Sequence, residues 1–441
     1  MTIEENKEMR VLLFIILFGS LLADEPLQKD WHGVRPLARQ SVSNEEEGPR
    51  LLMTGDWNGA REAARDWGLD IAGSYSNDLL GNPVGGKHHG FANAGSFGLF
   101  LTFDLEKIMK ATGTTFFASF IVRHGNNLSA TKIGNQFEVA QLYGTETYVL
   151  NELYLKKTAY EGKISAKAGR LDPGNDFLAS PLYAYYVNNA FFGNPVSIYF
   201  NTDFSTLPNA TWGAYLQFRP IPSFNMQFAC YNQNKNIFKN KYHGANFTFD
   251  SRLGVMWITE WAYLLNQGKE DTGLPGNYRV GGYYVTGRFD VFEGGTQRGN
   301  FGYYFLIDQM VYRHKTQQLT PFGAFLFAPN NRNEFPFFFA AGLVYKGFIP
   351  SRKDDAIAIG AAYGRYSSDL RHLEQQAKRQ GFMTPHGNQP QTAETILELN
   401  YWIQATHWLT ITPDVQYVID PKGLGTIQDA LVLGVEIEIL L

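Results

Sequence analysis

The sequence predicts an all-β protein, a transmembrane antiparallel β-barrel of about sixteen strands. Aromatic residues make up 15% of the 441 residues and glycine contributes 44, whereas the mean hydropathy of −0.24 is slightly polar. Many runs alternate between apolar and polar residues, and long and short connections follow one another between them. These features are typical of strands that carry one apolar and one polar face in an outer-membrane barrel.

The first residues predict export. Val11 to Ala23 is the only long apolar run, and Lys7 and Arg10 precede it. This run is too short to cross a membrane comfortably as a helix, so we interpret residues 1–23 as a signal peptide. Residues 24–54 are polar and mixed in charge, which indicates a periplasmic leader. No later run reaches the roughly eighteen apolar residues of a transmembrane helix, so any spanning structure must be a closed barrel.

The barrel domain is predicted over residues 55–441 and begins with a short helix. Asp56-Trp57-Asn58 is expected to cap this helix, which runs from Gly59 to Trp67. Beyond Trp67 the period changes to two. In the final run, Leu433 and Ile437 share one face while Glu436 and Glu438 share the other, as expected where the apolar face contacts lipid.

Sixteen runs are predicted as strands, and two merged runs would reduce the number to fourteen. They lie at 68–80, 95–104, 114–123, 147–157, 163–170, 210–219, 224–232, 253–266, 278–286, 300–313, 319–328, 336–347, 355–366, 392–405, 408–418 and 429–440. The connections at 81–94, 124–146, 171–209, 233–252, 287–299 and 367–391 are long or rich in Asn and Gly, whereas those at 158–162, 220–223, 314–318, 348–354 and 406–407 are short. We expect the short turns to face the periplasm and the long loops to face outside.

One stretch, Gly169 to Asp203, has no clear strand or helix period. A connection of this length is unusual in a compact domain and is then functional or disordered. It is rich in aromatic residues, which disordered segments lack, and its Asn and Asp residues outnumber its single Arg. We therefore predict that it folds inward and forms the constriction of a membrane pore.

Composition excludes several classes of function. The net charge of −4 gives no basic field for nucleic acid, and the lone Cys230 excludes an internal disulfide and a thiolate metal cluster. No phosphate loop, Ser-His-Asp arrangement or zinc spacing is present in the sequence. We expect no cofactor and no metal.

Several stretches in a consistent order resemble the OprB-like family of carbohydrate-selective porins of Gram-negative bacteria. The stretches are 54–61 (TGDWNGAR), 78–83 (DLLGNP), 123–125 (RHG), 151–155 (NELYL), 169–171 (GRL), 180–183 (SPLY), 193–195 (GNP), 274–276 (LPG), 286–290 (TGRFD) and 308–310 (DQM). The resemblance runs from about residue 51 to the end of the chain. It implies a sixteen-stranded outer-membrane channel for sugars that is narrowed by inward loops.

Three charged residues at strand positions, Arg123, Glu152 and Arg170, are predicted to face the lumen, because a charge on the lipid face costs roughly 2–4 kcal/mol at the membrane centre. Two interpretations stay open. They form a ring of donors and acceptors for sugar hydroxyls, with aromatic rings packing on sugar faces, or they form ion pairs that tether the loop to the wall. The full set predicted along the constriction is Arg123, Glu152, Arg170, Asp172, Asp176, Tyr183, Asn188, Asn189, Asn194 and Asn201.

The predicted function is passive diffusion of monosaccharides or small oligosaccharides through the outer membrane into the periplasm. The alternatives are an outer-membrane enzyme and a secreted soluble sugar-binding β-protein. Asp172, Asp176 or Asp203 with Glu152 could suggest a glycosidase carboxylate pair, but no preferred acid stands out, so we predict no enzyme. The expected partners are permeating sugars, outer-membrane lipid and the barrel assembly machinery; a homo-oligomer is compatible with the pattern, and nucleic acid is not expected.

Overall fold

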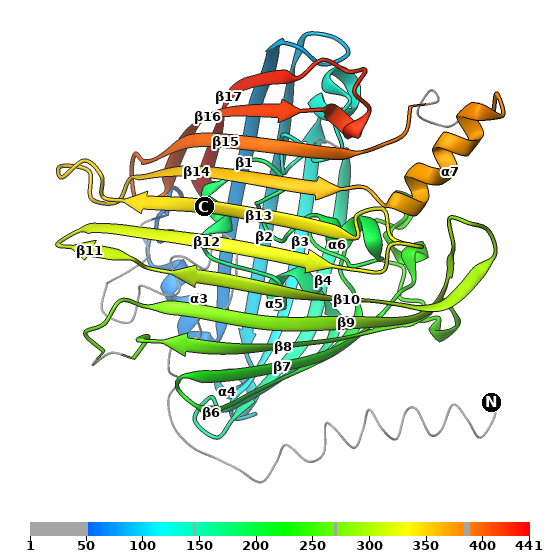
Figure 1. Cartoon of the computed structure of the whole chain (residues 1–441). Coiled ribbons are helices and arrows are strands. Elements are labelled where there is room, and N and C mark those ends of the chain that lie inside the picture. Colours follow the sequence, from blue (N-terminus) through cyan, green and yellow to red (C-terminus); the bar gives the residue numbers. More distant parts are fainter. Residues whose placement is uncertain (1–51, 144–145, 269–270, 383–388) are drawn as a thin grey trace, which may run out of the picture.

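The computed structural model describes residues 52–143, 146–268, 271–382 and 389–441. The predicted signal peptide, and all but the last three residues of the predicted leader, lie outside the described residues. The described chain forms one closed antiparallel barrel in which β1 pairs with both β17 and β2, and this confirms the predicted fold class (Figure 1). In the described part of the chain, no helix is long and apolar enough to cross a membrane.

The strands are β1 (Leu69–Val84), β2 (Gly90–Asp104), β3 (Thr114–Gly125), β4 (Thr147–Ala159), β5 (Ile164–Leu171), β6 (Thr211–Ile221), β7 (Phe224–Asn232), β8 (Val255–Leu265), β9 (Gly276–Asp290), β10 (Thr296–Gln309), β11 (Tyr312–His314), β12 (Gln317–Phe327), β13 (Phe337–Lys346), β14 (Ala356–Arg365), β15 (Ala393–Gln404), β16 (Leu409–Ile419) and β17 (Ala430–Leu440). β11 is a three-residue extension that follows β10 closely and pairs with β12 alone. β10 and β11 therefore count as one strand of the barrel, and the sixteen predicted strands are confirmed.

Helices are short and lie between the strands. They are α3 (Ala60–Trp67), α4 (Leu105–Met109), η2 (Ser129–Ile133), α5 (Pro173–Asp176), η3 (Tyr183–Tyr185), α6 (Ser197–Asn201), η4 (Lys235–Phe238), η5 (Asn240–Tyr242), η6 (Ser251–Leu253), α7 (Ser368–Arg379) and η7 (Pro421–Gly423). The predicted helix at 59–67 is confirmed as α3, but its predicted cap is wrong. Asp56 accepts the backbone N–H of Asn58 at 3.1 Å, and Gly59, with φ +86°, precedes the helix without a capping side chain.

The two ends of the barrel differ, and we call them the loop end and the turn end. At the loop end lie loop 2 (126–146), loop 3 (172–210), loop 4 (233–254) and α7; the hairpin of β11 and β12 marks the turn end (Figure 1). Two predicted long loops, 81–94 and 287–299, are corrected. β1 and β2 continue to Val84 and Gly90, and β9 and β10 continue to Asp290 and Thr296, so the turns between them are tight.

Large apolar side chains cover the outside of the wall. Phe305 on β10, Trp261 on β8 and Leu433 on β17 are each between 44% and 46% exposed. Their neighbours along the strands, such as Glu260 and Glu436, are buried inside. This alternation is what a membrane-spanning barrel requires, because lipid contacts the outer face and the polar residues are kept within.

Candidate functional site

Cross-strand register separates the two faces of the wall. Residues directly opposite one another on antiparallel strands point to the same side of the sheet. Ser76 on β1 pairs with Glu438 on β17, and Glu436 lies two residues before Glu438 on the same side. Leu433 has the opposite parity and is 44% exposed. The predicted faces of the last strand are therefore confirmed, with both glutamates inside.

Loop 3 folds into the barrel and rests against β13 and β14. These strands turn small side chains inward, namely Ala340, Gly342, Ala358, Gly360 and Ala362. A Cβ atom at Gly342 would lie 2.3 Å from the hydroxyl oxygen of Tyr186, and one at Gly360 would lie 2.8 Å from its ring. The Tyr186 ring also stacks on Phe191 with centroids 4.7 Å apart. Glycine at these two wall positions thus makes the recess that receives the loop's aromatic rings.

Wall carboxylates hold the backbone of loop 3. Glu398 on β15 accepts the backbone N–H groups of Val187 at 2.7 Å and Asn188 at 3.1 Å. Glu260 on β8 accepts the backbone N–H of Leu178 at 3.0 Å. A buried backbone N–H that loses its partner is costly, so these contacts to wall carboxyl groups fix the path of the loop.

A third attachment joins loop 3 to β9 and β10. Asp308 on β10 accepts a hydrogen bond from the Ser180 hydroxyl at 2.9 Å and from the Arg279 guanidinium of β9 at 2.9 Å. Arg279 also donates to the backbone carbonyl of Ala179. The buried ion pair of Arg279 and Asp308 therefore binds loop 3 through the Ser180 side chain and the Ala179 backbone.

Loop 2 is attached in the same way. Glu394 on β15 accepts the backbone N–H groups of Gln136 and Phe137, each at 2.7 Å. The Phe137 ring lies over Gly364 of β14, where a Cβ atom would be 2.3 Å from the ring.

Loop 2 also holds a carboxyl group with a shifted pKa. Burial raises the pKa of Glu138 to about 7, and the positive charge of Lys422 opposes this rise.

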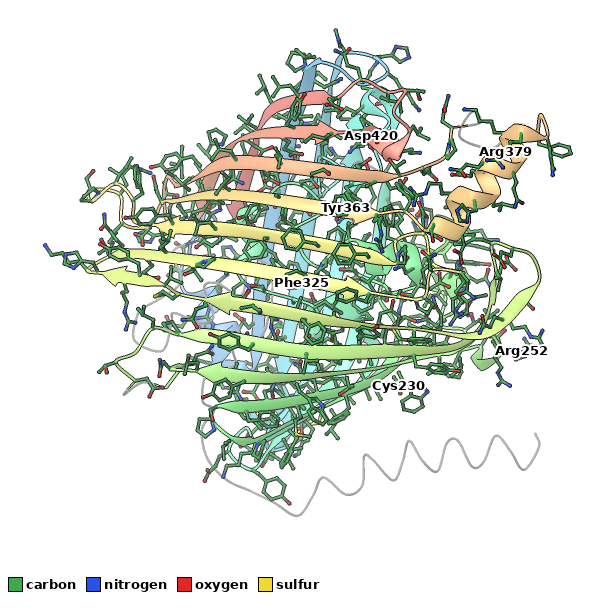
Figure 2. All side chains as sticks on the ribbon, viewed as in Figure 1. Cys230, Arg252, Phe325, Tyr363, Arg379 and Asp420 are labelled. Carbon is green, nitrogen blue, oxygen red and sulfur yellow. The ribbon has the colours of Figure 1, made fainter. Side chains whose placement is uncertain are left out.

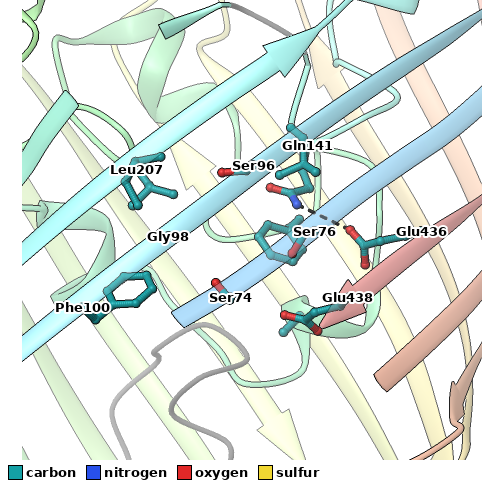
Figure 3. A pocket seen from close by; sticks show the side chains of 13 residues that line it. Ser74, Ser76, Ser96, Gly98, Phe100, Gln141, Leu207, Glu436 and Glu438 are labelled. Atoms are coloured by element: carbon teal, nitrogen blue, oxygen red, sulfur yellow. Dashed lines mark hydrogen bonds between the residues drawn. The ribbon is translucent and has the colours of Figure 1, made fainter. Parts of the chain in front are cut away.

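Because both loops lie against one side, a cavity remains along the other, lined by polar and apolar side chains; we call it the passage. One side of the passage is formed by β1, β2, β3 and β17, and the facing side by loops 2 and 3 (Figure 3). The lining residues are Ser74, Ser76, Ser96, Gly98, Phe100, Ile121, Gln141, Leu142, Ala184, Phe192, Leu207, Glu436 and Glu438. The Gln141 amide of loop 2 donates to Glu436 across the passage at 3.5 Å.

The lining combines hydrogen-bonding groups with aromatic surface. Serine hydroxyls donate and accept, glutamates accept, and the Gln141 amide does both. Phe100 on the wall and Phe192 on loop 3 supply rings that can contact the apolar face of a solute. This arrangement suits a small, neutral solute with many hydroxyl groups.

The predicted acidic residues tether loop 3 instead of lining the passage. Glu152 on β4 accepts the backbone N–H of Asp172 and the Asn175 amide, each at 3.2 Å. Asp172 begins α5 and accepts the Gly174 N–H at 2.9 Å. Asp176 pairs with Lys167 of β5 at 2.5 Å. These contacts support the tethering interpretation, and they do not leave the carboxylates arranged around a substrate cleft.

The predicted Asn and Tyr residues of loop 3 are also engaged in packing. Asn188 donates to Gln416 at 2.8 Å, Asn194 donates to the carbonyl of Phe177 at 2.9 Å, and Asn201 binds the backbone of Phe335. The Asn189 backbone N–H donates to the backbone carbonyl of Glu138 in loop 2 at 2.9 Å. Tyr183 is buried, with its ring edge-on to Phe322.

Arg123 lies beside the passage. It is an inward residue of β3, paired with Ser96 of β2, and Ser96 lines the passage. Its guanidinium donates to the carbonyl of Leu207 at 3.3 Å and lies 5.5 Å from the centre of the Tyr143 ring. Of the predicted charged residues, Arg123 is the one that lies beside the passage through its cross-strand neighbour Ser96.

The expectation that Arg170 faces the lumen is corrected. Arg170 pairs with Leu153 and Trp212, which have the outward parity of β4 and β6. It is nevertheless buried, because loop 4 covers this part of the wall and the guanidinium donates to the carbonyls of Gly244 and Ala210. Loop 3 leaves the wall after Leu171, and Arg170 fixes loop 4 beside this point.

Analysis of the sequence missed the wall residues that hold the loops, namely Glu260, Arg279, Asp308, Glu394 and Glu398. A signal was present, because Glu394 and Glu398 share one parity within the predicted strand 392–405. These wall residues lie on strands distant in the sequence from the loops that they hold, so no local pattern connects the two.

Comparisons with known proteins agree with this architecture. Residues 88–441 match the family described as carbohydrate-selective porin, OprB family. The chain is 28% identical to Porin B of Pseudomonas aeruginosa over 415 residues, which cover 88% of this chain and 90% of that protein. It is 24% identical to the putative porin QuiX of Acinetobacter baylyi, over 88% of this chain and 93% of that protein.

The high-pH structure of OprB from Pseudomonas putida is similar in fold. The TM-score is 0.83 at 26% identity, and the match covers 90% of this chain and 99% of that one. The low-pH structure of the same protein gives a TM-score of 0.58. Because the family model matches residues 88–441, well over half of the sequence, the chain belongs to the OprB family of carbohydrate-selective porins.

Proposed function

We propose that sugars diffuse along the passage between the β1–β2–β17 wall and loops 2 and 3. The chain is a passive outer-membrane channel for carbohydrates. The finer assignment, to monosaccharides and small oligosaccharides, is supported by the lining of the passage, which places Ser76, Ser96 and Glu436 opposite Phe192. Serine and glutamate exchange hydrogen bonds with hydroxyls, while the ring offers surface to the C–H face of the sugar.

The predicted residues have two roles: one lies beside the passage, and the others hold the loops. Arg123 lies beside the route and offers a planar set of donors. The remaining predicted residues keep loop 3 or loop 4 in place and thereby set the width of the route. Individual contacts with a permeating sugar must stay weak, because a tightly held solute would block the channel.

Insertion of a large ring into the passage tests the proposal. Ser96→Trp on β2 places the ring inside, and Leu99→Trp on the same strand places an identical ring on the outward face. We expect Ser96→Trp to lower glucose entry in liposome swelling by about ten-fold, and Leu99→Trp to leave it within about two-fold of the unmodified protein. Undiminished glucose entry through Ser96→Trp would show that sugars take another route.

The other two classes considered from the sequence, an outer-membrane enzyme and a secreted soluble sugar-binding protein, receive no support from the comparisons. Glu152, Asp172 and Asp176, which suggested a carboxylate pair, are held by the loop contacts described above. Recognition by the barrel assembly machinery and self-association of the chain stay predictions. Detergent-solubilised mass measurement would test self-association directly.

A further inference from the structure

Loop 4 folds over the outside of the wall, unlike loops 2 and 3. The Phe247 ring of loop 4 lies 6.2 Å from the ring of Trp212, which has the outward parity of β6. His243 stacks on Tyr148, an outward residue of β4 that is 61% exposed, with ring centroids 3.9 Å apart and planes 5° apart. The carbonyl of His243 also accepts the backbone N–H of Leu150 at 3.0 Å. Loop 4 therefore covers β4 to β6 on the side that meets the membrane.

The charge of loop 4 is opposite to that of the chain. Residues 233–254 contain four cations and one carboxylate, Asp250, in a chain whose net charge is −4. The cations Lys235, Lys239, Lys241 and Arg252 are all exposed. Lys235 pairs with Asp203 of loop 3 at 2.8 Å, and Arg252 pairs with Asp250 at 2.9 Å. Figure 2 shows Arg252 at the loop end of the barrel, where Arg379 and Asp420 also lie. Lys239 and Lys241 thus carry the net positive charge of this outer rim.

Exposed aromatic rings accompany these cations. Phe249 is 58% exposed and Phe247 is 47% exposed, and the ammonium group of Lys241 lies 4.8 Å from the centre of the Tyr242 ring. Aromatic rings beside lysines are typical of the boundary between membrane hydrocarbon and headgroups, where the ring enters the apolar layer and the cation meets phosphate. The combination indicates a lipid-contacting surface instead of a purely aqueous loop.

We infer that loop 4 binds the phosphorylated headgroup of the glycolipid that forms the outer leaflet of the outer membrane. Lys239 and Lys241 would contact phosphate, and Phe247 and Phe249 would lie against the acyl chains. A second copy fits the surface less well, because a symmetric contact would bring the same cations of both copies together. The inference rests on the loop end facing outside, and it is independent of the sugar route.

Native mass spectrometry of the full chain tests the inference, with lipid A carrying both phosphates as the probe. Lys239→Gln combined with Lys241→Gln removes two charges from loop 4. Lys378→Gln combined with Arg379→Gln removes two exposed charges from α7 at the same end and serves as the control. We expect the loop 4 variant to retain lipid A at an occupancy lower by about three-fold or more, and the control to match the unmodified protein. Dephosphorylated lipid A should bind the unmodified protein as weakly as lipid A binds the loop 4 variant.

Three outcomes would overturn the inference. Equal occupancy in the loop 4 variant and the unmodified protein would remove the lysines from the site. An equal loss in the control would show non-specific attraction to charge, and a protein dimer that excludes lipid A would make loop 4 an interface between copies. Heat-modifiable migration on gels confirms that each variant is folded, and glucose entry into liposomes should be the same in all of them. A failure of sugar transport would therefore be seen separately from a failure of lipid binding.

Discussion

The carboxylate of Glu398 on β15 accepts the backbone N–H of Val187 in loop 3 at 2.7 Å, and Glu398 is 2% exposed. The contact joins residues more than two hundred positions apart in the sequence and holds the loop by its backbone. Because a backbone N–H is offered by almost any residue, the loop sequence can vary while the attachment persists. The specificity of the attachment therefore lies on the wall.

Glu398→Ala is expected to loosen loop 3. It removes two hydrogen bonds to the loop and leaves two buried N–H groups without this partner, each at a cost of roughly 1–3 kcal/mol. Single-channel conductance should rise and fluctuate more, and discrimination between glucose and larger sugars should fall. Thr395→Ala, on the outward face of the same strand, should change neither quantity. A quiet channel of unchanged conductance in Glu398→Ala would mean that the aromatic packing alone holds the loop.

Arg170→Ala is expected to release loop 4 without altering the lumen. The guanidinium donates to the carbonyls of Gly244 and Ala210, and Arg170 has outward parity. Proteolysis within residues 233–254 should become faster, while the ratio of cation to anion permeability stays unchanged. Lys163→Ala, at the turn end of β5, provides the control for loss of one positive charge. A shift in ion selectivity on Arg170→Ala would restore the lumenal placement that the register contradicts.

The barrel could be predicted from the sequence because each strand carries its own period of two. The parity of Leu433 and Glu436 follows from neighbouring residues alone, and so do the number and order of the strands. Arg170 shows where this reasoning fails. Its strand is short, and its environment is supplied by Gly244, a residue of another loop that no local pattern connects to it.

The site was harder to predict because it depends on contacts between distant segments. The inward folding of loop 3 could be predicted from its length and its rings. The side on which it rests could not, because that depends on Gly342 and Gly360 leaving room on β13 and β14. The predicted polar residues of loop 3 bind the wall, a neighbouring loop or loop 3 itself, whereas Ser74, Ser76 and Ser96 of the wall line the passage.

Leu433→Arg tests the lipid-facing side of the last strand. Leu433 is 44% exposed on the outer face, so a charge there should lower the stability of the barrel in bilayers by roughly 2–4 kcal/mol if it lies near the membrane centre. Glu436→Gln, on the inward face of the same strand, should leave stability nearly unchanged. Reversible unfolding by denaturant in lipid vesicles measures both. Equal losses would mean that Glu436 contributes a structural contact comparable to the cost of exposing a charge to lipid.

Loop 2 is expected to be more firmly held at acidic than at alkaline pH. Burial raises the pKa of Glu138 from 4.5 to about 7, so the folded loop binds this proton more tightly than the unfolded chain does. The resulting stabilisation is fully present below about pH 4.5 and is lost as the pH rises through about 7; a rise of this size corresponds to roughly 3 kcal/mol at most. Hydrogen exchange of residues 129–140, corrected for intrinsic rate, should therefore quicken between pH 5 and pH 8.

Glu138→Gln should remove most of that pH dependence, because the neutral amide cannot titrate. Glu146→Gln, at an exposed position of the same loop, is the matched control and should retain it. Persistence of the full pH dependence in Glu138→Gln would assign it to another titrating group, of which Glu394 lies close enough to Glu138 to affect it electrostatically.

The passage is expected to favour cations over anions. Glu436 and Glu438 line it, and of the described residues that line it none is basic. Fixed carboxylates in a narrow polar passage attract cations and repel anions, an effect that weakens as salt screens the field. Glu436→Gln combined with Glu438→Gln should lower the potassium-to-chloride permeability ratio toward one, as measured by reversal potentials across a salt gradient. Glucose entry should fall much less, because glutamine keeps a carbonyl acceptor for sugar hydroxyls.

Glu62→Gln combined with Glu161→Gln removes the same charge from exposed positions outside the passage and should leave the permeability ratio unchanged. An unaltered ratio in the Glu436 and Glu438 variant would show that ions pass by a path these carboxylates do not line, and the passage between the wall and loops 2 and 3 would then not be the conducting route.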